Sequence, residues 1–353
     1  MPLTDQQITE CRDRYRRELD RYAKMAEVTY DKCLDIVHRK LAVRATVQRR
    51  AKSWKSFAEK LRKPEIRAKC ASVDDVFARI GDLAGVRIAT YLESDRKPVV
   101  EELRKEFVGA DGGEPIIDVK DKSENGRHYR ATHCQVYLPE ADLSGIDENL
   151  QSTTCEIQVC SLLAHVFNEI EHDLQYKPLS GELSQKEREL IDQLGLLTKS
   201  GDITIKQLLQ ETDTRLKERT GEFADVYDFI ARMRGVMQLG SFGANAGQLF
   251  DELVELNLNT PEAVSQLVVG NGSQSLAEIS NAEYRRLKAF LIDTQSELVL
   301  EDGSSDVLLA GLLKKSASQI LKNHPTGRGM GRPSRLTQIA KAYARMPASE
   351  AAA

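Results

Sequence analysis

The sequence predicts an α+β fold, with a mixed β-sheet of about four to five strands flanked by helices and an all-α C-terminal extension. Two observations predict it. Short runs rich in β-forming residues alternate with helical periodicity between about residues 40 and 178. Beyond Gly240, helical segments are short and are separated by turn signals such as Thr260-Pro and Gly270-Asn-Gly-Ser.

The N-terminal region is expected to be helical. Thr4 and Gln7 have the spacing of a capping box, and helical periodicity runs from about residue 5 towards Lys60, with breaks. Pro64 ends this region, because proline interrupts a helix.

The remaining elements follow from local composition and periodicity. Residues that favour β-structure gather in four runs, which predict strands at residues 85–92, 116–119, 129–138 and 153–159. Residues 120–127 are polar and form the expected loop between two of these strands. Helical periodicity predicts helices at residues 73–80, 94–107, 184–220, 223–239 and 281–298. Ser94 is a suitable N-cap for the second of them.

We expect four parts along the chain: N-terminal helices (1–39), an α+β core (40–178), a helical extension (179–312) and a basic, partly flexible tail (313–353). The last 41 residues carry eight Lys or Arg against one acid, Glu350. Such a tail could bind tRNA or another RNA by counterion release, although a disordered, solubilising tail is the favoured interpretation. The helices between residues 184 and 300 could form a homo-oligomer interface or restrain the active site.

Composition indicates a cytoplasmic globular protein. The net charge of −4 gives no general attraction to nucleic acid, and no apolar run approaches the roughly 20 residues that span a membrane. The first residues are polar and do not resemble a signal peptide. The six cysteines include no CxxC pair, which argues against a zinc ribbon and a disulfide framework.

A basic row near residue 55 is the first candidate site. On a helix, Lys52, Ser56 and Lys60 would stack at intervals of four residues, with Arg50 nearby. Several cations and donors on one face suit a polyphosphate. The alternative is a solvated basic helix face, which this row taken alone favours.

Two further motifs lie next to predicted strands. Asp82, followed by Gly85 and Arg87, stands where a carboxylate could hold a divalent cation such as Mg²⁺, although this motif taken alone favours a turn or cap residue. Tyr129 could stack on a base while Arg130 and His133 meet phosphate or sugar. The alternative is a strand-edge tyrosine with solvated neighbours.

The densest motif spans residues 155–177. Glu156 and Gln158 share one face of a predicted strand, because side chains two residues apart point the same way. His165, Glu169 and His172 recur at helical spacing and form one stripe of the following helix. Polar groups held beside an apolar helix face usually bind something.

The order and spacing of these motifs resemble the synthetase domain of RelA/SpoT-type alarmone synthetases. The quoted patterns are Arg-x-Lys-x₃-Ser-x₃-Lys, Asp-Leu-x-Gly-x-Arg, Tyr-Arg-x-x-His, Glu-Ile-Gln and Glu-Ile-Glu-His-x-Leu-x-Tyr-Lys. The resemblance covers about residues 40–178 and implies a nucleotidyltransferase-like synthetase core in a small, synthetase-only form. It implies transfer of the β,γ-diphosphate of ATP to the 3′-hydroxyl of GTP or GDP, which yields (p)ppGpp and AMP.

The resemblance also implies a role for each residue. Asp82 and Glu156 would hold Mg²⁺, and Glu156 would be the base that accepts the proton of the attacking hydroxyl. The residues implied to bind ATP are Arg50, Lys52, Ser56, Lys60 and Arg87, of which Arg87 would either contact adenine or brace the site. Those implied to bind the acceptor nucleotide are Tyr129, Arg130 and His133. The implied supporting residues are Gln158, Glu169, Glu171, His172 and Lys177.

Three positions depart from the family pattern: His128 replaces a usual glycine, Cys160 a usual arginine and Phe167 a common tryptophan. The first two, with the basic tail, leave a second hypothesis open. Some small relatives are toxins that pyrophosphorylate the 3′ end of tRNA or modify adenine nucleotides. A third hypothesis is a nucleotide-binding regulator without turnover. The retention of Arg50, Asp82 and Glu156 argues against it, because a binder needs no metal acid and base together.

Overall fold

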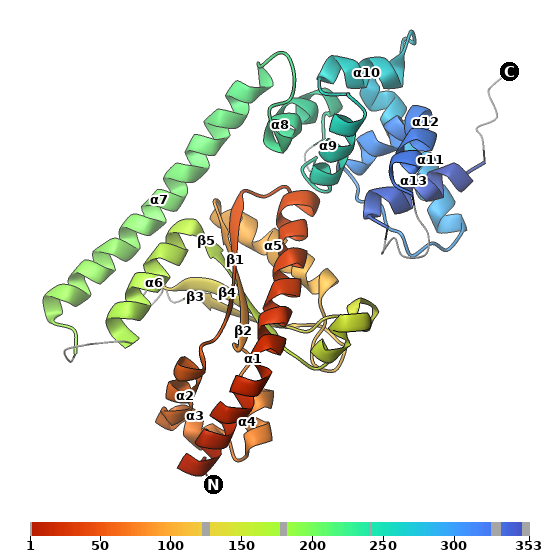
Figure 1. Cartoon of the computed structure of the whole chain (residues 1–353). Helices are drawn as coiled ribbons and strands as arrows, with labels where there is room; N and C mark the ends of the chain where they lie inside the picture. The colour runs from red at the N-terminus through yellow and green to blue at the C-terminus, as the bar shows by residue number, and fades with distance from the viewer. Residues whose placement is uncertain (1, 122–127, 177–181, 240–241, 326–332, 348–353) are drawn as a thin grey trace. The chain divides into compact units, whose positions relative to one another are not determined.

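The computed structural model describes residues 2–121, 128–176, 182–239, 242–325 and 333–347, with the side chains of 175 and 176 left out (Figure 1). Within these residues the chain divides into two compact units. The first comprises Met1–Val37 and Val43–Gln207, and the second comprises His38–Ala42 and Leu208–Ala353.

The first unit is built on a mixed sheet of five strands among the described residues, in the order β1-β2-β5-β4-β3. The strands are β1 (Ala45–Ala51), β2 (Ala84–Thr90), β3 (Ile116–Asp121), β4 (Arg130–Val136) and β5 (Cys155–Ser161). Strands β2 and β5 pair in parallel, and the other neighbours are antiparallel. The α+β class, the mixed sheet and the helical C-terminal region are therefore confirmed.

Helices flank both faces of this sheet. The helices from α1 to α7 are α1 (Asp5–Leu34), α2 (Trp54–Arg62), α3 (Pro64–Lys69), α4 (Val73–Arg79), α5 (Arg96–Glu106), α6 (Leu162–Tyr176) and α7 (Gln185–Lys217); of these, α2 and α4 pack on α1, and α3 packs on α2. Helix α1 packs on β1, β2 and β5, and α5 packs on β4 and β5. Helix α6 packs on β2, β4 and β5, where Ala164 meets Ala131 and Cys160. Thr4 and Gln7 form the predicted capping box at the start of α1.

Two local predictions are wrong. Residues Ala45–Ala51 were expected within a helical region, but they form β1, the edge strand paired with β2. Backbone pairing with a buried strand outweighs the local helical pattern of this short polar segment. Arg50 therefore lies on a strand, apart from the helix that carries Ser56. Ser94 does not cap α5, because it lies inside a 3₁₀ turn, Glu93–Asp95, that precedes the helix.

The second unit is helical throughout its described residues. Its helices are α8 (Val226–Met237), α9 (Ala246–Glu255), α10 (Pro261–Val269), α11 (Leu276–Asp293), α12 (Asp306–Asn323) and α13 (Arg335–Arg345). Helix α11 begins five residues before the predicted start, because Ser275 and Glu278 form a capping box there. No helix among the described residues combines the length and apolar character needed to cross a bilayer.

The favoured interpretation of residues 313–353 as a disordered, solubilising tail does not hold for most of the described residues there. Helices α12 and α13 cover most of residues 313–345, and their apolar side chains lie in the core of the second unit. Leu313, Ile320 and Ile339 are each at most 1% exposed. Burial of these side chains outweighs the solvation of the interspersed basic residues.

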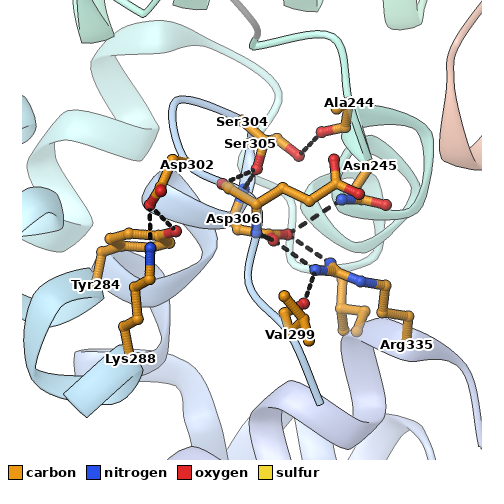
Figure 2. A network of polar contacts seen from close by, with 12 residues as sticks. Ala244, Asn245, Tyr284, Lys288, Val299, Asp302, Ser304, Ser305, Asp306 and Arg335 are labelled. Atoms are coloured by element: carbon orange, nitrogen blue, oxygen red, sulfur yellow. Dashed lines mark hydrogen bonds and ion pairs between the residues drawn. The ribbon is translucent and has the colours of Figure 1, made fainter. Parts of the chain in front are cut away.

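A buried aspartate, Asp306, forms hydrogen bonds that link the N-terminal ends of helices α9, α12 and α13 (Figure 2). Asp306, at the start of α12, is 1% exposed and accepts two bonds of 2.6 Å from the guanidinium of Arg335, at the start of α13. The backbone N–H of Glu301 and the amide of Asn245, before α9, donate to the same carboxylate. A buried charge needs such partners, because desolvation otherwise makes it unfavourable.

Replacing Arg335 with methionine is expected to lower the free energy of unfolding of the second unit by about 3–5 kcal/mol, because Asp306 would stay buried without its cation. The matched control is Lys288→Met: Lys288 pairs with the 75%-exposed carboxylate of Asp302, so the loss should stay below about 1 kcal/mol. Urea denaturation followed by circular dichroism measures both effects. Trp54, the chain's one tryptophan, lies in the first unit, so its fluorescence reports that unit separately. Equal losses in the two variants would contradict the prediction.

Candidate active site

The central strands β2 and β5 present polar side chains on one face of the sheet. In β5, Ile157 and Val159 are fully buried, while Glu156 and Gln158 point to the opposite face and are partly exposed. Gly85 of β2 is the parallel partner of Glu156, so these two positions lie side by side. The alternation of β5 thus places two polar groups at the middle of the sheet.

Glu156 is held by polar groups on both sides. His133 Nδ1 donates to its Oε1 at 3.2 Å, and Gln158 Nε2 donates to its Oε2 at 2.7 Å. The hydroxyl of Tyr129 forms a hydrogen bond of 2.8 Å with His133 Nε2. Tyr129, His133, Glu156 and Gln158 are therefore brought together, as the motifs predicted.

The same chain of hydrogen bonds continues to helix α6. Arg87 Nη2 donates to Gln158 Oε1 at 3.4 Å and lies 2.8 Å from Glu169 Oε1. Arg87 thereby connects the strand that carries Glu156 to the helix that follows it. This contact supports the predicted bracing role of Arg87 and the supporting role of Glu169.

A second cluster surrounds Asp82, in the segment that leads into β2. Lys52 Nζ and Lys60 Nζ lie 2.9 and 2.8 Å from Asp82 Oδ2. The other oxygen, Oδ1, is buried and has no hydrogen-bond partner among the described residues. Ser56 lies one turn before Lys60 on α2, where its hydroxyl accepts from Ser53 at 2.9 Å. Lys52 and Lys60 thus meet at Asp82, although Lys52 precedes the helix.

One pocket joins the two clusters. Its cavity volume is about 100 Å³, and it lies over β1, β2 and β5. The residues that line it are Gln48, Arg49, Arg50, Asp82, Gly85, Val86, Arg87, Glu156 and Gln158. The predicted metal acids and the predicted phosphate-binding Arg50 therefore face the same space.

The ionisation of the two acids is set by their neighbours. Burial opposes the charge of Asp82, but Lys52 and Lys60 outweigh it and hold the pKa of that carboxyl below its ordinary value. Burial likewise opposes the charge of Glu156, but His133 and the hydrogen bond from Gln158 together outweigh it and lower the pKa of Glu156. Both groups are therefore carboxylates at neutral pH.

The donor set fits a hard divalent cation. Asp82 offers a buried, unpaired oxygen, and Glu156 is a second carboxylate on the same pocket. Oxygen ligands of this kind are those that Mg²⁺ takes in phosphoryl-transfer sites, where substrate phosphates and water complete the coordination. Asp82 and Glu156 could hold the ion between them.

Residues 49–180 match the family model described as "Region found in RelA / SpoT proteins". These residues are a RelA/SpoT-type region. Similar solved structures include the small alarmone synthetase 1 from Bacillus subtilis, which is 24% identical over 57% of this chain and 99% of its own, with a TM-score of 0.44. A GTP pyrophosphokinase family protein from Streptococcus pneumoniae is 19% identical over 56% of this chain and 94% of its own, with a TM-score of 0.45. Likeness at this level is no evidence of a shared substrate, and among curated proteins none matches the chain.

The remaining predicted residues of the RelA/SpoT-type region differ in their placement. Arg130 points away from Tyr129 and His133, because neighbouring strand residues face opposite sides, and its guanidinium is buried against Asp202. Its predicted contact with a nucleotide is therefore corrected. Glu171 is 8% exposed on α6, and His172 is exposed beside Asp173. Lys177 lies outside the described residues.

The three residues that depart from the family pattern, His128, Cys160 and Phe167, are buried and pack against other side chains of this region. Cys160 is 2% exposed and contacts Ala131 and Ala164, with Tyr129 against the same cluster. Burial raises the pKa of its thiol to about 12. His128 is 4% exposed and meets Phe167 edge to face at 5.8 Å.

Some residues near the site were not predicted from the sequence. Gln48 and Arg49 line the pocket, and the signal that could have found them is the β-branched pair Thr46-Val47 at the start of β1. Asp202 was also missed, because it lies far along the chain in α7.

A separate group in the second unit has the composition of a metal site. Glu252, Glu255 and His324 have potential ligand atoms within 4.8 Å of one another. The buried carboxylate of Glu252 already pairs with His324 at 2.5 Å and accepts from Asn323. These internal bonds account for the group without a ligand.

Proposed function

We propose that this chain is an ATP-dependent pyrophosphokinase that makes (p)ppGpp by transferring a diphosphate group from ATP to the 3′-hydroxyl of GTP or GDP. The observation that carries the proposal is the pair of carboxylates on one pocket, with the buried Oδ1 of Asp82 unpaired beside basic residues. The match of residues 49–180 to the RelA/SpoT family model supports it. A site that only bound nucleotide would not need both acids.

The ATP phosphates are proposed to bind on the side of β1 and α2. Lys52 and Lys60 already lie at Asp82, and Arg50 lines the same pocket. These cations offset the charge that develops on the phosphoryl oxygens during transfer. Ser56, one turn before Lys60, offers a hydroxyl to the same phosphates.

Glu156 is proposed to take the proton from the 3′-hydroxyl of the acceptor. The hydroxyl oxygen then forms a bond to the β-phosphorus, the bond from that phosphorus to the α,β-bridging oxygen breaks, and AMP leaves. His133 and Gln158 hold both oxygens of Glu156, so its direction is set before the substrate arrives. Mg²⁺ held by Asp82 and Glu156 would supply charge stabilisation to the transferred phosphates.

The acceptor base is proposed to stack on Tyr129. Its ring lies on the same face of the sheet as Glu156, and its hydroxyl is fixed by His133. Burial raises the pKa of the Tyr129 phenol, so its hydroxyl keeps its proton at neutral pH. Base stacking on an aromatic ring contributes about 1–3 kcal/mol and tolerates different bases.

A single transfer assay tests this function. The chain is incubated with γ-labelled ATP and Mg²⁺, and separately with GDP, GTP, no added acceptor, or deacylated tRNA. We expect label on GDP or GTP and a matching release of AMP. Label on tRNA alone, or on adenine nucleotides alone, would support the toxin-type alternative. No transfer to any acceptor would favour a nucleotide-binding regulator.

Two partner predictions stay predictions. One is a homo-oligomer formed through the helical extension, and the other is RNA contact through the basic residues of 313–353. Of those residues, Arg335 pairs with Asp306 and Lys314 pairs with Glu283. Fewer of the tail's charges are therefore available to RNA than its composition suggests.

A further inference from the structure

Helix α7 makes polar contacts with the two buried residues that flank Tyr129. Before it, His128 is 4% exposed and its Nε2 lies 2.7 Å from Asp192 Oδ1. After it, Arg130 is 7% exposed and its Nη2 donates to Asp202 Oδ2 at 2.8 Å. Both acids belong to the part of α7 that lies in the first unit.

Asp202 connects two strands of the sheet. It is 7% exposed, and its Oδ2 also accepts from the hydroxyl of Ser161 at 3.1 Å. Ser161 ends β5, the strand that carries Glu156, whereas Arg130 begins β4. The buried carboxylate of Asp202 therefore links Ser161, at the end of the strand that carries Glu156, to Arg130, at the start of the strand that follows Tyr129.

The packing between α7 and His128 is close. A Cβ atom added at Gly195 would lie 2.1 Å from the ring of His128, which is far inside van der Waals contact. Glycine is unfavourable inside a helix compared with alanine, so its presence in α7 here serves the approach of the imidazole. His128 and Gly195 thus fit together as a complementary pair.

The backbone of Arg130 is held from the other side by α6. Asn168 Oδ1 accepts from the Arg130 N–H at 3.4 Å, and Asn168 Nδ2 donates to the Arg130 carbonyl at 3.2 Å. The main chain next to Tyr129 is therefore fixed by α6, and its neighbouring side chains are fixed by α7. Tyr129 itself projects to the opposite face, towards His133.

We propose that α7 is part of the acceptor site, and that Asp192, Gly195 and Asp202 are positioning residues that set the place of Tyr129. The inference rests on the proposed function, in which Tyr129 stacks on the acceptor base. Small displacements of a binding group lower the rate strongly, because the reacting atoms must be held in near-attack geometry. Arg130 takes part through Asp202 and does not contact the nucleotide.

The first test varies each substrate separately in the transfer assay. Asp202→Ala is expected to raise the KM for GTP or GDP about tenfold, the size of a partly lost base stack, with the KM for ATP changed less than about twofold. Asp202→Asn keeps an acceptor oxygen for Arg130 and Ser161, so it should recover most of the loss. The control is Glu189→Ala. It removes an exposed acid of the same helix that bonds only to Gln185 among the described residues, and it should leave both KM values unchanged.

A second variant covers the case in which Asp202→Ala fails to fold. Gly195→Ala makes α7 intrinsically more helical, so any defect comes from the collision with His128. Its matched control is Gly235→Ala in α8, where a Cβ would have nothing within 4 Å. Hydrogen–deuterium exchange of the peptide 128–136 is expected to accelerate in Gly195→Ala and to stay unchanged in Gly235→Ala.

Hydrogen–deuterium exchange distinguishes a failure of the proposed transfer activity from a failure of the positioning role of α7. If the wild type transfers to no acceptor, the proposed function fails, while faster exchange at 128–136 would still support positioning of Tyr129 by α7. Unchanged exchange and an unchanged acceptor KM in the α7 variants would overturn the inference. So would equal changes in the KM values for ATP and acceptor, because a general structural defect does not discriminate between the two substrates.

Discussion

Replacing Glu156 with glutamine is expected to reduce the transfer rate by about 10²–10⁴-fold, the usual contribution of a general base. Glutamine keeps the size of the side chain but cannot take a proton from the 3′-hydroxyl. It also removes the negative charge that His133 and Gln158 now stabilise. Steady-state transfer from γ-labelled ATP to GDP measures the loss in kcat.

The binding of nucleotide should survive this substitution. Among the described residues, no hydrogen bond or ion pair joins the proposed phosphate-binding cations, Arg50, Lys52 and Lys60, to Glu156. Titration calorimetry with a non-hydrolysable ATP analogue is therefore expected to show affinity within a few-fold of wild type. Glu114→Gln is the matched control, because Glu114 is 80% exposed and pairs only at the surface with Arg104. Full activity in Glu156→Gln would refute the assignment of the base.

The strand and helix that carry Glu156 were predictable because their patterns are local. The alternation Cys155 to Ser161 and the apolar stripe that follows appear in the structure as β5 and α6, in direct succession. The strand β1 was not predictable in the same way. Its burial pattern has no clean alternation, and its state is decided by pairing with β2, which lies almost 40 residues further along the chain.

The candidate site likewise combines contacts that follow from local spacing with contacts that only tertiary packing creates. The proximity of Tyr129 and His133 follows from their spacing along one stretch of extended chain. The same alternation places Arg130 on the opposite face, so its orientation was also predictable from the sequence. The partner of Arg130 could not be predicted, because Asp202 is separated from it by 72 residues and belongs to another helix. The meeting of Lys52 and Lys60 at Asp82 is also a product of tertiary packing and not of one helix face.

Asp82→Asn is expected to lower the transfer rate on the order of 10³-fold, equivalent to about 4 kcal/mol, by removing a ligand of the divalent cation. The wild-type carboxylate is well suited to that role, since Lys52 and Lys60 hold its pKa below the ordinary 3.8 and keep it charged at neutral pH. A group with a lowered pKa loses its charge only as the pH falls below that value. Protonation of Asp82 should therefore not limit activity between pH 5 and pH 8.

The substitution should separate catalysis from phosphate binding. Asp82 now neutralises two lysines, so the asparagine variant would leave Lys52 and Lys60 with more of their charge for the phosphates of ATP. We expect its affinity for an ATP analogue without Mg²⁺ to equal or exceed that of the wild type, while the gain in affinity on adding Mg²⁺ disappears. Asp74→Asn, at a 90%-exposed carboxylate paired with Arg14, should change neither quantity. A retained response to Mg²⁺ in Asp82→Asn would mean that the cation is held by other groups, and the unpaired Oδ1 would then need another explanation.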